Sequence, residues 1–145
     1  MIRVVDASAI GALLFGEPEK SWVEAQTDDA ELIAPPLLIF ELGNICWKKL
    51  RGLPAQASIV LPAWNAWCAS ALVKAEPTDP TQTILLARDH DLTFYDASYL
   101  WLARYRTADL VSLDMKLVRA ARKLGIRAPM PRDRANRHTT PRSRN

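Results

Sequence analysis

The amino-acid sequence predicts an α/β fold, in which a central parallel sheet of four to five short strands is covered by helices on both faces. Two observations support this prediction. Short apolar runs alternate with longer segments of helical composition along most of the chain, and strands buried on both faces have such continuous apolar runs. Parallel strands also need long crossover connections, which the intervening helices would supply.

The predicted elements follow one another in a regular order. Strands are predicted at residues 2–5, 31–34, 71–75 and 110–113, with a fifth candidate at 126–128. Helices are predicted at residues 9–15, 18–27, 36–51, 55–68, 81–89, 96–105 and 115–124. Ser8 is a candidate N-cap for the first helix, and Gly16, Gly52 and Gly125 follow the ends of three helices. Pro62 is expected to break or kink the helix at 55–68.

The chain of 145 residues is expected to form one compact domain, at residues 1–130. Residues 131–145 hold five arginines and one aspartate, so they carry more positive charge than the net +3 of the whole chain. This tail has almost no large apolar groups, and we expect it to be disordered and solvated. An arm that contacts nucleic acid is the alternative.

Composition excludes several classes of protein. The two cysteines, Cys46 and Cys68, are too few for a disulfide framework or a zinc site, and each is expected to be a small buried side chain. The apolar stretch at 9–15 is too short to span a bilayer and does not resemble an export signal. We therefore expect a cytoplasmic protein without a membrane segment.

Four acidic residues stand at positions that would bring them together. Asp6 directly follows the first strand, Asp114 directly follows the fourth, and Asp96 begins a helix. Glu41 lies inside a helix on the same face as leucine and isoleucine neighbours, where a lone carboxylate is unfavourable unless it is paired or bound to a metal. Because the carboxyl ends of parallel strands share one edge of the sheet, all four can meet there.

Each acid also has a simpler interpretation when taken alone. Asp96 and Asp114 could be helix N-caps, Asp6 could be a turn residue, and Glu41 could reach past the apolar face to solvent. The joint arrangement is what predicts a site. Carboxylates that converge repel one another unless a cation lies between them. Oxygen ligands without His or Cys favour a hard ion such as Mg²⁺ or Mn²⁺.

The segments that carry these acids resemble the four motifs of the PIN domain family, in particular the VapC-type toxins of prokaryotic toxin–antitoxin pairs. The resemblance covers about residues 2–128. It rests on Val4-Val5-Asp6-Ala7-Ser8, Glu41-Leu42-Gly43-Asn44, Leu92-Thr93-Phe94-Tyr95-Asp96-Ala97-Ser98-Tyr99 and Leu110-Val111-Ser112-Leu113-Asp114.

The resemblance implies a three-layer α/β/α fold, endoribonuclease activity with Mg²⁺ or Mn²⁺, a homodimer, and a small antitoxin that blocks the acidic groove. Carried over by motif, Asp6, Glu41, Asp96 and Asp114 would form the catalytic and metal-binding site. Asp6 and Asp96 are expected to be direct ligands, Asp114 a direct or water-mediated ligand, and Glu41 a ligand or the general base.

Three polar residues are expected to support the acids. Ser8 matches the hydroxyl residue that the family has beside its first acid, and Asn44 matches an Asn common in the family one turn after Glu41. Ser112 stands where the family often has Thr before its last Asp, which keeps the hydroxyl.

Two basic groups are candidate contacts for RNA phosphates. The first, at the end of the helix that carries Glu41, is Lys48, Lys49 and Arg51, and the second, which follows Asp114, begins with Lys116 and Arg119. The alternative is that both are solvated helix faces, favoured by the helix dipole. The five tryptophans are expected in the core or an interface rather than as base-stacking residues. His90 and His138 lie away from every motif, which argues against a histidine general base.

Three rival functions remain open at this stage. A phosphatase or phosphotransferase with Asp6 as nucleophile would usually need a second acid two residues on, where this chain has Ser8. A non-catalytic binding module of the same fold would not need all four acids. A nuclease acting on DNA would use the same phosphodiester chemistry.

Overall fold

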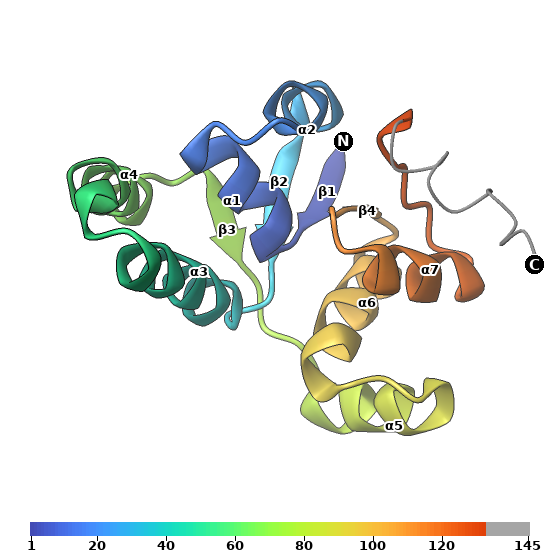
Figure 1. Ribbon diagram of the computed structural model, residues 1–145. Coiled ribbons are helices and arrows are strands. Elements are labelled where there is room, and N and C mark those ends of the chain that lie inside the picture. The colour runs from blue at the N-terminus through green and yellow to red at the C-terminus, as the bar shows by residue number, and fades with distance from the viewer. Residues whose placement is uncertain (133–145) are drawn as a thin grey trace, which may run out of the picture.

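A four-stranded parallel sheet forms the centre of the protein, in the strand order β3-β2-β1-β4 (Figure 1). Its strands are β1 (Ile2–Val5), β2 (Glu31–Ala34), β3 (Val73–Ala75) and β4 (Asp109–Val111). All neighbouring strands pair in parallel, and the computed structural model describes residues 1–132 of the chain. The predicted parallel sheet is confirmed, with four strands.

Helices flank the sheet. They are α1 (Ala7–Phe15), α2 (Lys20–Thr27), α3 (Leu38–Gly52), α4 (Ala57–Ala69), α5 (Pro80–His90), α6 (Phe94–Arg106) and α7 (Met115–Lys123), with a 3₁₀ turn at Pro54–Gln56 before α4. Helix α1 contacts α2, α3 and α4, whereas α5 packs on α6 and α6 packs on β1 and β4. The two groups of helices lie apart from each other around the sheet (Figure 1).

The core consists of the central strands and the helix faces packed on them. Val4, Val5 and Ile33 are fully buried, as are Leu110 and Val111 of the neighbouring strand. Burying a side chain of this size contributes about 1.5–3 kcal/mol relative to leaving it exposed. The β-branched runs of the sequence therefore hold the sheet in place and fix where each strand ends.

Four tryptophans, Trp22, Trp64, Trp67 and Trp101, pack partly buried against this core, as expected. Trp47 differs, because half of its side-chain surface is exposed. Of the two cysteines, Cys46 is buried but Cys68 is exposed, so the expectation for the second was wrong.

Several helix boundaries differ from those predicted. The N-cap of α1 is Asp6 rather than Ser8, because the Asp6 carboxylate accepts from the backbone N–H of Ala9. Helix α6 is capped by the Thr93 hydroxyl, which accepts from the N–H of Asp96, so Asp96 lies in the first turn and is not the cap. Asp114 does cap α7, which is the simpler interpretation that its position allowed.

Pro62 does not break its helix. Helix α4 continues from Ala57 to Ala69 with Pro62 inside it. Pro62 and Ser58, whose carbonyl loses its helical partner, are both exposed, so water can satisfy the freed oxygen.

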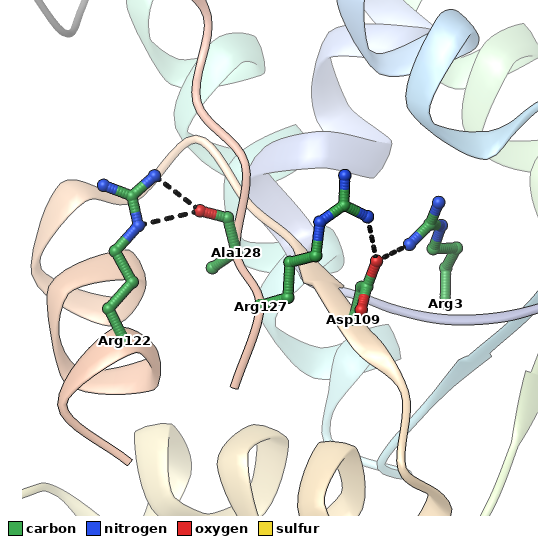
Figure 2. A network of polar contacts seen from close by, with 5 residues as sticks. All are labelled: Arg3, Asp109, Arg122, Arg127 and Ala128. Atoms are coloured by element: carbon green, nitrogen blue, oxygen red, sulfur yellow. Dashed lines mark hydrogen bonds and ion pairs between the residues drawn. The ribbon is translucent and has the colours of Figure 1, made fainter. Parts of the chain in front are cut away.

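The segment at 126–128 is not a strand, but it lies against β4. The N–H of Leu110 donates to the carbonyl of Arg127 at 2.9 Å. Figure 2 shows how side chains hold this segment: Arg122 donates twice to the carbonyl of Ala128, and Asp109 lies between Arg127 and Arg3 and binds both. The predicted tail at 131–145, which includes His138, lies outside the described residues from 133 onward.

Within residues 1–132, the structure has no helix with the length and apolar character needed to cross a bilayer.

Candidate active site

All four predicted acids line one cavity of about 280 Å³. Asp6 reaches it from the end of β1, Glu41 from the first turn of α3, Asp96 from the first turn of α6, and Asp114 from the N-cap of α7. Residues more than 100 positions apart in the sequence thus meet in one place. The sheet causes this meeting, because β1 and β4 are parallel neighbours and end side by side.

Asp6 is held firmly at the bottom of this cavity. It is 5% exposed, and it accepts hydrogen bonds from Ser8 Oγ at 2.7 Å, Ala9 N at 3.0 Å and Ser112 Oγ at 2.5 Å. Burial raises the pKa of Asp6, the three hydrogen bonds oppose that rise, and the charge of Asp114 adds to it. The carboxylate is fixed in position, but its charge is not compensated.

Ser8 and Ser112 connect the ends of the two central strands. Each hydroxyl donates to Asp6 and also accepts a backbone N–H, from Leu113 at 2.9 Å for Ser8 and from Asp114 at 3.0 Å for Ser112. The two serines therefore set the position of Asp6 relative to the loop that carries Asp114. This is the supporting place that the sequence predicted for both.

Glu41 is half-buried and has a tyrosine partner. Tyr99 of α6, which is almost fully buried, donates from its hydroxyl to Glu41 Oε1 at 2.7 Å. Burial raises the pKa of Glu41, the hydrogen bond from Tyr99 opposes the rise, and the charges of Asp6, Asp96 and Asp114 add to it. Glu41 thus lies on the inward face that the helical spacing indicated.

Tyr99 lines the cavity and was not among the predicted site residues. The available signal was its spacing, because Tyr99 lies three residues after Asp96 and therefore on the same face of α6. Its pKa is raised by burial and by the neighbouring acids, so the hydroxyl keeps its proton and remains a donor to Glu41.

The other two acids lie nearer the surface. Burial raises the pKa of Asp96, the charge of Asp114 raises it further, and the charge of Lys116 opposes the rise. Asp114 is exposed, and its carboxylate accepts from the N–H groups of Lys116 at 2.9 Å and Leu117 at 3.3 Å. Asp114 is therefore both a helix cap and a member of the cavity wall.

No ion pair within residues 1–132 involves any of the four acids. Within the same part of the chain, no three Asp, Glu, His or Cys side chains are already arranged to hold a metal ion. The chemistry of the cavity nevertheless suits one, because it gathers the oxygens of carboxylates that make no ion pair. The acids would have to close on an ion when it binds.

The predicted basic residues have different surroundings. Lys48 lines the acidic cavity, as does Asn44. Lys49 instead pairs with Glu17 at 3.4 Å and lies over the Phe15 ring, and Arg51 lies over the Trp47 ring. Lys116 and Arg119 line a separate hollow beside the cavity.

Comparison with known proteins identifies the class to which this fold and site belong. Residues 3–123 match the PIN domain, and the chain therefore belongs to the PIN domain family. Two relatives come from Pyrobaculum aerophilum. Ribonuclease VapC3 is 34% identical over 121 residues, which cover 81% of this chain and 92% of the relative. Exonuclease VapC9 is 31% identical over 116 residues, which cover 79% of this chain and 82% of the relative.

Solved structures confirm the fold. PAE2754 from Pyrobaculum aerophilum has a TM-score of 0.67 at 26% identity, covering 88% of this chain and 83% of that chain. Mycobacterium tuberculosis VapC20, described as a Sarcin-Ricin loop cleaving toxin, has a TM-score of 0.59 at 18% identity, covering 81% and 94%. The likeness to VapC20 concerns the fold alone. The prediction of a PIN-like α/β fold, and of VapC proteins as relatives, is confirmed.

Proposed function

We propose that this protein is a metal-dependent endoribonuclease that acts as the toxin of a VapBC-type toxin–antitoxin pair. The observation that carries the proposal is the cavity where Asp6, Glu41, Asp96 and Asp114 meet without a paired cation. A structural cluster of acids would normally be neutralised by arginine or lysine. The VapC relatives support nuclease activity, and the name of VapC3 supports RNA as the substrate.

In this proposal, Asp6, Asp96 and Asp114 hold Mg²⁺ or Mn²⁺, and Glu41 completes the site. A bound divalent ion would supply a Lewis acid that lowers the pKa of water and offsets charge on the phosphoryl oxygens. Glu41 acts as the general base, since burial and the neighbouring acids raise its pKa and so make its carboxylate a stronger base.

The neighbouring polar residues position the acids. Ser8 and Ser112 hold both oxygens of Asp6, and Tyr99 holds one oxygen of Glu41 and leaves the other free. Lys48 lines the same cavity and would contact a phosphate there, close to the point of cleavage.

The proposal includes two protein partners, a second copy of the chain and a small antitoxin. Exposed apolar side chains support this part, because large ones on a surface indicate protein contacts. On α3, α4 and the turn between them these are Ile39, Phe40, Trp47, Leu53, Ile59 and Leu61.

Cleavage of single-stranded RNA in Mn²⁺ tests the enzyme activity. We expect cleavage by the wild type, none in EDTA, and a loss of at least about a hundredfold in kcat for Asp6→Asn, the size seen when one catalytic group is removed. Glu24→Gln, which removes an exposed acid from α2, is the matched control and should cleave normally. Cleavage that survives Asp6→Asn would contradict the proposal, and a binding module would not cleave at all.

The two relatives differ in name, one a ribonuclease and one an exonuclease, so the mode of attack needs its own test. A circular RNA has no ends, and an endonuclease cuts it whereas an exonuclease does not. We expect cleavage of the circle. Matched DNA substrates should be cut more slowly, and equal rates would overturn the assignment to RNA.

Expression in cells tests the toxin role. We expect the wild type to stop growth and Asp6→Ala to permit it, at equal protein levels. Equal growth of the two strains would contradict the toxin role without contradicting nuclease activity.

A further inference from the structure

A second hollow, of about 320 Å³, lies between α7 and the turn that joins α5 to α6. Its walls are formed by Lys116, Arg119 and Lys123 of α7 on one side, and by His90 at the end of α5 with Asp91 and Leu92 of the turn on the other. Neither the family resemblance nor the cavity of four acids assigns a role to this hollow.

The hollow gathers positive charge. Lys116, Arg119 and Lys123 lie at intervals of three and four residues, so they follow one another along a single face of α7. All three are exposed, and none makes an ion pair within residues 1–132. Asp91 is the one acid of the lining, so the cations outnumber it even when His90 is neutral. The ligand that suits such a hollow is an anion.

The hollow adjoins the acidic cavity through two residues of α7. Asp114 lines the cavity, and Lys116, two residues later, lines the hollow. Lys116 is close enough to Asp96 for its charge to lower the pKa of that acid. The hollow therefore lies next to the cavity along α7, where a strand with its scissile phosphate in the cavity could continue.

Two of the three cations at the end of α3 are less available for the same purpose, and the third, Lys48, lines the acidic cavity itself. Lys49 is held by Glu17 and by the Phe15 ring, and the guanidinium of Arg51 lies 4.7 Å from the centre of the Trp47 ring. Using them for RNA would first break these interactions. By contrast, Lys116, Arg119 and Lys123 of α7 make no ion pair within residues 1–132, so all three charges are free to bind phosphate.

We infer that the hollow beside α7 binds the backbone phosphate next to the scissile one, so that single-stranded RNA leaves the cavity along α7 and not along α3. This inference rests on the proposed ribonuclease function. It adds His90 and Lys123 to the residues that contact substrate, and it gives the strand a direction on the protein surface.

Binding of a fluorescein-labelled single-stranded RNA tests this inference. The affinity is measured by anisotropy in EDTA, where no cleavage occurs, over a series of salt concentrations. We expect Arg119→Gln/Lys123→Gln to weaken binding at least about tenfold at low salt. The slope of log affinity against log salt should fall by about 0.7 for each RNA phosphate that the variant no longer neutralises.

Two matched variants, each lacking two cations, make the test selective. Lys49→Gln/Arg51→Gln removes two cations of the competing group on α3 and keeps Lys48 in the cavity. Lys20→Gln/Arg104→Gln removes two exposed cations from α2 and the end of α6. We expect both to keep the wild-type salt slope. All variants alter exposed or partly exposed side chains, and their thermal melting is compared first to verify that they fold.

The outcomes separate this inference from the proposed function. An unchanged salt slope in Arg119→Gln/Lys123→Gln, or a larger loss of affinity in the α3 variant, would overturn the path along α7. If the wild type binds RNA through α7 but does not cut it in Mn²⁺, the nuclease proposal fails and the hollow stands. If the wild type cuts RNA and the α7 variant does so with the same KM, the nuclease proposal stands and the inference about the hollow is overturned.

Discussion

Two buried carboxylates follow parallel strands of the same sheet, yet their surroundings are opposite. Asp6 follows β1 and Glu76 follows β3, and they are 5% and 9% exposed. Glu76 binds Arg106 of α6 and lies 3.3 Å from Lys74, whereas Asp6 has hydroxyls and an N–H around it. The pKa of Glu76 is lowered, chiefly by Arg106, and the pKa of Asp6 is raised, chiefly by burial.

The comparison shows what separates a structural acid from a candidate catalytic one. Position at the carboxyl end of a strand and burial are shared, so neither decides the role. The difference is the cation that the chain provides. Glu76 pairs with one and thereby ties the end of β3 to α6. Asp6 and its three acidic neighbours make no ion pair within residues 1–132.

Adding an arginine that can pair with the four acids should abolish this difference and have the largest effect. Asn44 lines the cavity one turn after Glu41, and Asn44→Arg would place a guanidinium among the acids. A charge at about 4 Å is worth several kcal/mol near a protein surface, so we expect Mn²⁺ affinity to fall about a hundredfold or more. Titration calorimetry measures it, with Asn44→Gln as control. Equal affinity in the two variants would count against a metal site here.

Removing the arginine that pairs with Glu76 tests the same comparison at the structural acid. In Arg106→Leu the carboxylate stays buried beside Lys74 alone, so we expect its pKa to rise and thermal stability to fall by about 2–8 °C. Carboxyl chemical shifts and melting curves measure the two effects. Arg88→Leu, which loses only an exposed pair with Asp89, should change neither. A stable Arg106→Leu protein with an unchanged pKa of Glu76 would contradict the role given to the cation.

The pH dependence of stability should have opposite signs at the two sites. The raised pKa of Asp6 means that its favourable contribution to folding is full below about pH 4, the unfolded value, and is lost as the pH rises through the folded value. Asp6→Asn has no such titration. In EDTA, the melting temperature of the variant should therefore rise relative to that of the wild type as the pH increases from 4 to 7. A constant difference would contradict the raised pKa, and added Mn²⁺ should reverse the trend for the wild type alone.

The smallest expected effect comes from the hydrogen bond that positions Glu41. Tyr99→Phe removes the donor and leaves the ring in place, and one such bond is worth about 0.5–1.5 kcal/mol. We expect Mn²⁺ affinity to fall about threefold to tenfold, with a melting temperature close to that of the wild type. Tyr105→Phe, which alters an exposed tyrosine near the end of α6, is the control. Unchanged affinity in Tyr99→Phe would show that Glu41 needs no support from α6.

Local sequence patterns were enough to find the sheet and the four acids. The apolar runs marked the strands, and a carboxylate at the end of such a run must lie at the carboxyl edge, which placed Asp6 and Asp114. The helical spacing around Glu41 indicated its inward face. Each of these inferences uses neighbours within about four residues, which is the range over which periodicity carries information.

Pairings across the chain could not be read in this way. Nothing local shows that Arg106 neutralises Glu76, that Tyr99 binds Glu41, or that Glu17 occupies Lys49. Helix ends also depended on competition between nearby caps, and Thr93 took the place expected for Asp96. The sequence therefore could not show which acidic and basic residues have partners, because those partners come from distant parts of the chain.

The short stretch that follows α7 has a protective consequence. A sheet ends in a row of unsatisfied backbone groups, which can recruit another chain and start aggregation. On the β4 side, Arg127 covers part of that row through its carbonyl, and its side chain is anchored by the same Asp109 that binds Arg3 (Figure 2). The chain thus covers part of the β4 edge of its own sheet. A truncation before Arg127 would leave this edge of the sheet free to pair with another chain.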